Sequence, residues 1–96
     1  MHLVETFLPA DPRLSSKRRA LCRELAERFG GLTAFTRAPA KGLFADAGQQ
    51  IEDDIVILEI MTDVLEDAWW TALRVRLEDD FQQEQILIRA AGVKKL

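Results

Sequence analysis

Residues 51–62, IEDDIVILEIMT, decide the fold of this chain. After Asp54 the stretch is almost continuously apolar and rich in β-branched side chains. That composition is typical of a central strand with both faces covered, whereas a half-exposed strand alternates apolar and polar residues. We therefore expect a sheet that holds this segment in its interior.

Three further segments have the pattern of strands. Residues 2–8, HLVETFL, alternate loosely and stop at the prolines of PADPR, which are poor strand residues. Residues 32–38, LTAFTRA, alternate again, and residues 83–93, QEQILIRAAGV, form the last candidate strand. Residues 39–50 are polar, small and glycine-containing, so they are expected to form a loop.

The first helix is predicted between the first two of these strands. Ser15 or Ser16 can cap it, because a serine oxygen accepts a hydrogen bond from a first-turn amide. Leu21, Leu25 and Phe29 recur at the spacing of one helical face and predict a buried stripe. Gly30 follows and is expected to end the helix in the left-handed conformation.

A second helix is predicted over about residues 65–82. Asp63 can cap it, and Glu66 three residues later completes an approximate capping box. Its predicted buried stripe consists of Trp70, Leu73, Leu77 and Phe81.

The predicted order is therefore βαββαβ in an α+β domain. This is the ferredoxin-like arrangement, in which two helices cover one face of a four-stranded antiparallel sheet with strand order 4-1-3-2. Residues 1–96 form one domain, with a short loose tail from about residue 92.

Strand alternation sorts the side chains onto two faces of this sheet. The helix face is expected to hold Val4, Thr6, Leu8, Leu32, Ala34, Val56, Leu58, Ile60, Ile86 and Ile88. The opposite face, here called the open face, is expected to hold Leu3, Glu5, Phe7, Phe35, Arg37, Ile55, Ile57, Glu59, Met61, Leu87 and Arg89. The open face carries more apolar surface than a monomer normally exposes to water.

The open face also carries four charges of mixed sign. Glu5 with Arg89, and Glu59 with Arg37, are expected to form cross-strand ion pairs. Either two copies pack face to face and pair these charges, or the face lines a cavity where a ligand meets them. If the two carboxylates share a shielded cavity, one would hold its proton more tightly and could transfer it.

The composition excludes several classes of protein. The net charge is −3, and the single basic cluster, Lys17-Arg18-Arg19, lies near Glu24 and Glu27, so nucleic-acid binding is not expected. One cysteine, Cys22, cannot form an internal disulfide. Neither a signal peptide nor an apolar run of about 20 residues is present, so a cytoplasmic, bacterial-type protein without membrane contact is expected.

Motifs for catalysis and metal binding are mostly missing. With one histidine, His2, and one cysteine, no zinc site or nucleophilic triad can be assembled, and we expect neither a metal nor a cofactor. The glycines of RFGGLTAFTRAPAKGLF run from helix into strand, which excludes a phosphate-binding loop of the Walker type. Arg37 and Lys41 remain candidates for a small anionic ligand, and Trp69, at the margin of the second helix, for the wall of a ligand site.

The segments RFGGLTAFTRAPAKGLF, DDIVILEIM, WW and QEQILIRA together resemble a family of small uncharacterised bacterial proteins with a ferredoxin-like domain. The resemblance covers residues 28–90 and implies no activity or catalytic residue. In fold alone, the chain is also similar to dimeric α/β-barrel proteins, including cofactor-free monooxygenases and isomerases, and to trimeric signal-transduction proteins. The predicted loop of about twelve residues is short for the trimeric class.

The sequence thus favours a non-catalytic binding or assembly protein that forms a homodimer through its open face. The alternative is a cofactor-independent enzyme that uses Glu5, Arg37, Glu59 and Arg89 in a cavity between the sheet and a partner. A dry, paired interface would favour the first hypothesis, and an enclosed polar cavity the second.

Overall fold

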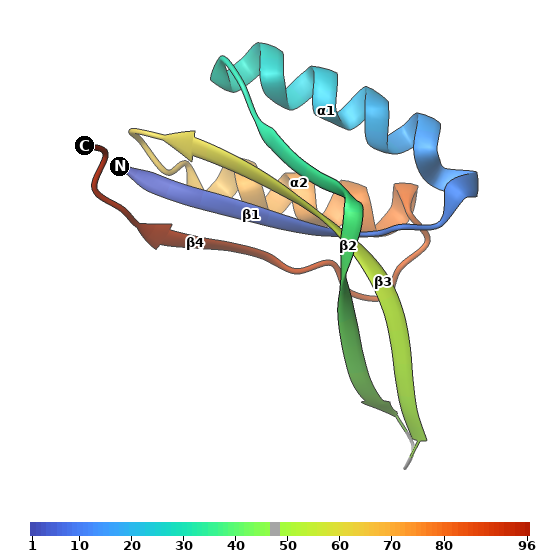
Figure 1. Cartoon of the computed structure of the whole chain (residues 1–96). Coiled ribbons are helices and arrows are strands. Elements are labelled where there is room, and N and C mark those ends of the chain that lie inside the picture. The colour runs from blue at the N-terminus through green and yellow to red at the C-terminus, as the bar shows by residue number, and fades with distance from the viewer. Residues whose placement is uncertain (47–48) are drawn as a thin grey trace.

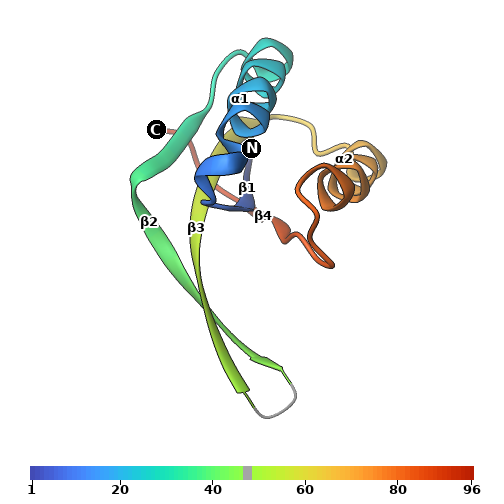
Figure 2. The ribbon, with the colours of Figure 1, turned by 90° about the vertical axis from the view of Figure 1, so that its right-hand side faces the viewer.

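The computed structural model describes the backbone of residues 1–46 and 49–96 and the side chains of residues 1–36 and 54–96. Its elements are β1 (His2–Pro9), a 3-10 turn (Pro12–Leu14), α1 (Ser15–Phe29), β2 (Thr33–Asp46), β3 (Gln49–Thr62), α2 (Asp67–Asp80) and β4 (Ile88–Gly92). The strands form one antiparallel sheet in the order β2-β3-β1-β4, and both helices lie on one side of it (Figures 1 and 2). The predicted fold class and strand order are confirmed.

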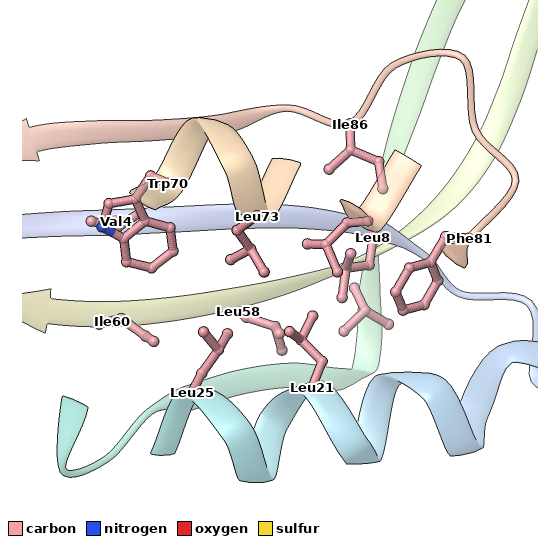
Figure 3. Close-up of a cluster of buried hydrophobic side chains, with 12 residues drawn as sticks. Val4, Leu8, Leu21, Leu25, Leu58, Ile60, Trp70, Leu73, Phe81 and Ile86 are labelled. Atoms are coloured by element: carbon pink, nitrogen blue, oxygen red, sulfur yellow. The ribbon is translucent and has the colours of Figure 1, made fainter. Parts of the chain in front are cut away.

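The hydrophobic core fills the space between the helices and the helix face of the sheet (Figure 3). Its buried members are Val4, Leu8, Leu21, Leu25, Val56, Leu58, Ile60, Trp70, Leu73, Leu77, Phe81 and Ile86. The predicted face assignment therefore holds for β1 and β3, and for Ile86. Ala34, on the edge strand β2, is exposed instead.

Helix α1 buries Leu21 and Leu25 as predicted, while Phe29 is half-buried. The predicted serine cap is wrong. Asp11 accepts a hydrogen bond from the backbone N–H of Arg13 at 2.9 Å and caps the 3-10 turn, and α1 then begins at Ser15 without a side-chain cap. The chain becomes helical at Pro12, directly after the cap residue Asp11, because the backbone dihedral angle φ of proline already matches that of a helix.

Gly30 ends α1 as predicted. Its φ is 83°, and its N–H donates to the carbonyl oxygen of Ala26 at 2.8 Å. The left-handed conformation is open to glycine because it has no Cβ to meet the neighbouring carbonyl.

Helix α2 buries its predicted stripe, but it begins at Asp67 rather than near residue 65. The predicted capping box does not form. Glu66 occupies the cap position without a side-chain bond to the helix, and its carboxylate instead accepts a hydrogen bond from Arg28 at 2.8 Å.

The prediction of a loop over residues 39–50 is wrong, because β2 continues to Asp46 and β3 begins at Gln49. Residues 36–39 of β2 bulge against the single position Val56, between the pairs Phe35–Ile57 and Ala40–Ile55. Pro39 lies in this bulge, where its missing N–H breaks no ladder bond.

β1 pairs with β3 only from Ile55 to Thr62. The remainder of the β2–β3 hairpin, residues 41–46 with 49–54, projects from the body as an arm (Figure 1). At the opposite edge, β4 spans only Ile88–Gly92, and residues 83–87 of the predicted strand lie outside it.

Candidate functional site on the open face of the sheet

The open face is organised in rows that run across the strands. The middle row consists of Arg89, Glu5, Glu59 and Thr33, which are partners in register from β4 to β2. One neighbouring row holds Phe7, Ile57 and Phe35, with Leu87 beside Phe7. The row on the other side holds Met61, Leu3 and Ala91. A charged row is thus enclosed by two apolar rows.

The apolar rows are not covered by the rest of the chain. Phe35, Met61 and Leu87 expose 47%, 45% and 54% of their surface, whereas Val56 and Leu58 on the helix face expose 3% and 1%. Leu3, Phe7, Ile55 and Ile57 are half-buried. An exposed apolar patch of this kind is more often a binding surface than a surface that stays in contact with water.

The predicted ion pair between Glu5 and Arg89 is present. Arg89 Nε lies 2.9 Å from Glu5 Oε1, and the guanidinium carbon lies 4.9 Å from the centre of the Phe7 ring. The arginine therefore contacts both the charged row and an apolar row. Because its side chain is 60% exposed, water and salt weaken the pair.

The second predicted ion pair is not tested, because the side chains of Arg37 and Lys41 lie outside the described residues. Glu59 is the direct partner of Glu5 on β1 and of Thr33 on β2. Within the part of the chain whose side chains are described, Glu59 forms no ion pair or hydrogen bond. Glu5 and Glu59 are therefore direct partners on adjacent strands, and among the described side chains Arg89 forms an ion pair with Glu5 alone.

Trp69 lies away from this site, in the helix layer. The Arg28 guanidinium carbon is 4.1 Å from the centre of its ring, and Phe29 and Trp70 meet it edge-on at 5.4 and 4.9 Å. Together with the Arg28–Glu66 ion pair, these contacts hold the C-terminal end of α1 against the N-terminal end of α2. The position at the helix margin agrees with the sequence prediction, and a role of Trp69 in ligand binding stays a prediction.

Two open pockets lie at opposite ends of the domain. One, of about 590 Å³, is lined by residues that include Met1, Arg28, Met61, Asp63 and Lys95. The other, of about 180 Å³, lies where the arm leaves the body and is lined by Phe7, Pro9, Ile55, Gln85 and Leu87, among others. Sequence reasoning missed both, because each joins segments that are distant along the chain and carry no local motif.

The described residues offer little support for metal or thiol chemistry. No group of three or more histidine, cysteine, aspartate or glutamate side chains among them could hold a metal ion. Burial raises the pKa of the half-buried Cys22 thiol above its ordinary value of 9.0, so it stays protonated at neutral pH. In the described part of the chain, no helix has the length and apolar character needed to cross a bilayer.

No protein-family model matches the chain, and no curated protein matches it in sequence. Solved structures do share its fold. The divalent cation tolerance protein CutA1 of Thermus thermophilus superimposes with a TM-score of 0.67 at 15% identity, over 99% of this chain and 86% of that one. A CutA1 mutant from Pyrococcus horikoshii gives 0.62 at 20% identity, over 100% and 86%.

The PII-like protein CutA from a Nostoc species gives a TM-score of 0.61 at 17% identity, over 97% of this chain and 81% of that one. Residues 40–46 and 49–50 belong to paired strands, so they form part of a long hairpin rather than the predicted loop. The chain therefore has the ferredoxin-like fold of the CutA1 proteins along nearly its whole length.

Proposed function

We propose that this chain is a non-catalytic binding or assembly protein whose copies associate through the open face of the sheet. The observation that carries this proposal is the pair of uncovered apolar rows that enclose Arg89, Glu5 and Glu59. The apolar interior of a membrane would leave the charged side chains of the middle row without partners. A nucleic acid would be repelled, because acidic side chains outnumber basic ones in that row. A second copy of the chain presents the same two apolar rows, which can cover the apolar rows of the first copy.

The small size of the domain and the free energy of burying apolar side chains favour a second copy of the chain as the partner of the open face. A 96-residue domain buries only about 60–65% of the surface of its unfolded chain, so further burial in an assembly adds substantially to its stability. Full burial of a side chain such as Phe35, Met61 or Leu87 stabilises an interface by roughly 1.5–3 kcal/mol relative to exposure. Because these three side chains are about half exposed in the subunit, each contributes part of that amount, and the half-buried Leu3, Phe7 and Ile57 of the same rows add to it.

The arm supplies a second argument for self-association. A two-stranded ribbon is marginally stable on its own in water, and within the sheet residues 41–46 and 49–54 pair only with each other. The outer edge of β4 has no strand beside it within the described residues. In our proposal the arm of one copy lies against the β4 edge of the next, which satisfies both elements.

The assembly is a closed homo-oligomer, and its smallest form is the homodimer expected from the sequence. The fold-level resemblances also include trimeric proteins, and an arm that reaches a neighbour's edge is compatible with a ring. The Thermus neighbour is named for divalent cation tolerance, which is not an enzymatic activity, and this supports the non-catalytic hypothesis over the enzyme.

The test compares two lysine substitutions by sedimentation velocity. Phe35→Lys places a charge in an apolar row of the open face, and Val75→Lys places the same charge on α2, at a side chain that is 56% exposed. We expect the wild type and Val75→Lys to sediment as the same oligomer and Phe35→Lys to sediment as a monomer of about 10.9 kDa. Assembly of Phe35→Lys at wild-type strength would contradict the proposal.

A further inference from the structure

We propose that association of this chain is coupled to proton uptake by Glu59, so that the oligomer becomes tighter as the pH falls. The inference rests on the proposed association through the open face and adds its regulation. It follows from the position of one carboxylate within the charged row.

The neighbours of Glu59 on the open face can be named strand by strand. Glu5 on β1 is its direct partner, so the two β-carbons are expected about 4.5–5.5 Å apart. Thr33 on β2 is its partner on the other side and carries no charge. Arg89 lies beyond Glu5 on β4, where its guanidinium is already bonded to Glu5 at 2.9 Å. The backbone of Arg37 lies in the β2 bulge, with its side chain outside the described residues.

The described part of the charged row therefore carries two negative charges and one positive charge. In a free subunit, Glu59 is half-buried and water still reaches it. When a second copy covers the face, that water is removed, and the approaching copy brings the same excess of negative charge. Burial of a carboxylate without a partner is strongly unfavourable, and a like charge beside it makes it more so.

Protonation removes both costs in one step. A proton from solvent adds to the Glu59 carboxylate, and no bond in the chain is broken. The neutral acid becomes a hydrogen-bond donor, and the Glu5 carboxylate and the Thr33 hydroxyl oxygen on the adjacent strands can accept from it. The proton thus replaces a repulsion between two strands with a bond between them.

The sign of the pH dependence follows from linkage. The oligomer holds more protons than the free subunits, so lowering the pH favours the oligomer. The dissociation constant is expected to fall by up to about tenfold per pH unit for each proton taken up.

The experiment measures the dissociation constant of the full chain by sedimentation between about pH 5 and pH 8, because coupled proton uptake makes this constant depend on pH. Glu59→Gln supplies a neutral side chain of the same shape. We expect it to assemble at pH 8 as tightly as the wild type does at pH 5, with a flat pH profile. Glu84→Gln is the matched control: it changes the net charge equally at an exposed position before β4, and should keep the wild-type profile.

Three outcomes would overturn the inference. A wild-type oligomer with the same dissociation constant across the range would refute proton uptake and leave the proposed association standing. Weaker association of Glu59→Gln at pH 8 would mean that the charged carboxylate is paired with a cation in the interface, with Arg37 the first candidate. Monomers at every pH, in the wild type and both variants, would refute the association itself.

Discussion

Cys22 illustrates how burial sets the chemistry of a single residue in this fold. It lies on α1 beside Leu21 and Leu25, and it packs against the core without being fully enclosed. Because burial disfavours the thiolate, the pKa of the thiol is raised, and the opposing effect of Arg18 is smaller. At neutral pH, the reactive thiolate is therefore rarer in the folded chain than in the unfolded one.

This predicts slow labelling of the native protein by a thiol-specific reagent. With a single cysteine in the chain, the measured rate reports on Cys22 alone. We expect the native protein to react several-fold more slowly than the same protein unfolded in urea, with the gap narrowing as the pH is raised. Equal rates in the two states at neutral pH would show that Cys22 is neither shielded nor perturbed.

Other features of single residues divide into those that a local pattern predicts and those that it does not. The Glu5–Arg89 pair was predictable, because alternation along β1 and β4 fixes which side chains share a face and a register. The contacts of Arg28 with Trp69 and Glu66 were not predictable, because they join helices that are distant in sequence. The Glu66 carboxylate bonds to Arg28 of α1 rather than to an N–H group of its own helix, and no local pattern indicates this.

At the scale of elements, the ends of helices are set by backbone conformation as much as by side-chain caps. Gly30 has a φ of 83°, and a Cβ added to it would meet no atom within 4 Å. Any cost of a substitution there therefore comes from the backbone itself. Gly92, at the end of β4, also has free space around it but lacks the left-handed conformation.

Alanine substitutions at Gly30 and Gly92 separate the effect of backbone conformation on stability from the effect of steric crowding. Gly30→Ala is expected to lower the free energy of unfolding by roughly 1–2 kcal/mol, because the left-handed conformation is unfavourable for alanine. Gly92→Ala should change it by less than about 0.5 kcal/mol. Urea unfolding of all three proteins at one protein concentration is the measurement, and equal values for the two variants would contradict the explanation.

The arm is the element that sequence reasoning missed. Pro39 and Gly42 interrupt the alternation of β2, and the small polar residues around them have the composition of a loop. Pairing with β3 nevertheless overrides local preference, since Gly42 is the direct partner of Asp53 in the ladder. The central strand β3 was predicted well for the opposite reason: its apolar run is continuous where β1 and the helices cover it.

Shortening the arm tests its role without touching the body. The variant replaces residues 43–52 by Asn-Gly, a sequence suited to a two-residue turn between the paired Gly42 and Asp53. We expect its circular dichroism to retain the helical signal of α1 and α2, because β1 supports β3 only from Ile55 onward. Its association should weaken, and unchanged association by light scattering would show that the arm lies outside the interface.

At the scale of the whole molecule, topology was the easiest feature to predict. The βαββαβ order and the short connections leave few ways to bury two helical stripes, and the observed strand order is one of them. The open face followed from alternation along the strands. The two pockets did not, because they depend on where the chain ends and the arm root come together in space.

Association through the uncovered rows of the open face is tested by the molar mass in solution, measured by sedimentation equilibrium at micromolar concentration. We expect an integral multiple of the 10.9 kDa subunit, of at least two copies, because association covers the apolar rows of the open face. A mass of one subunit across that concentration range would contradict it, since Phe35, Met61 and Leu87 would then remain exposed to water in the working protein.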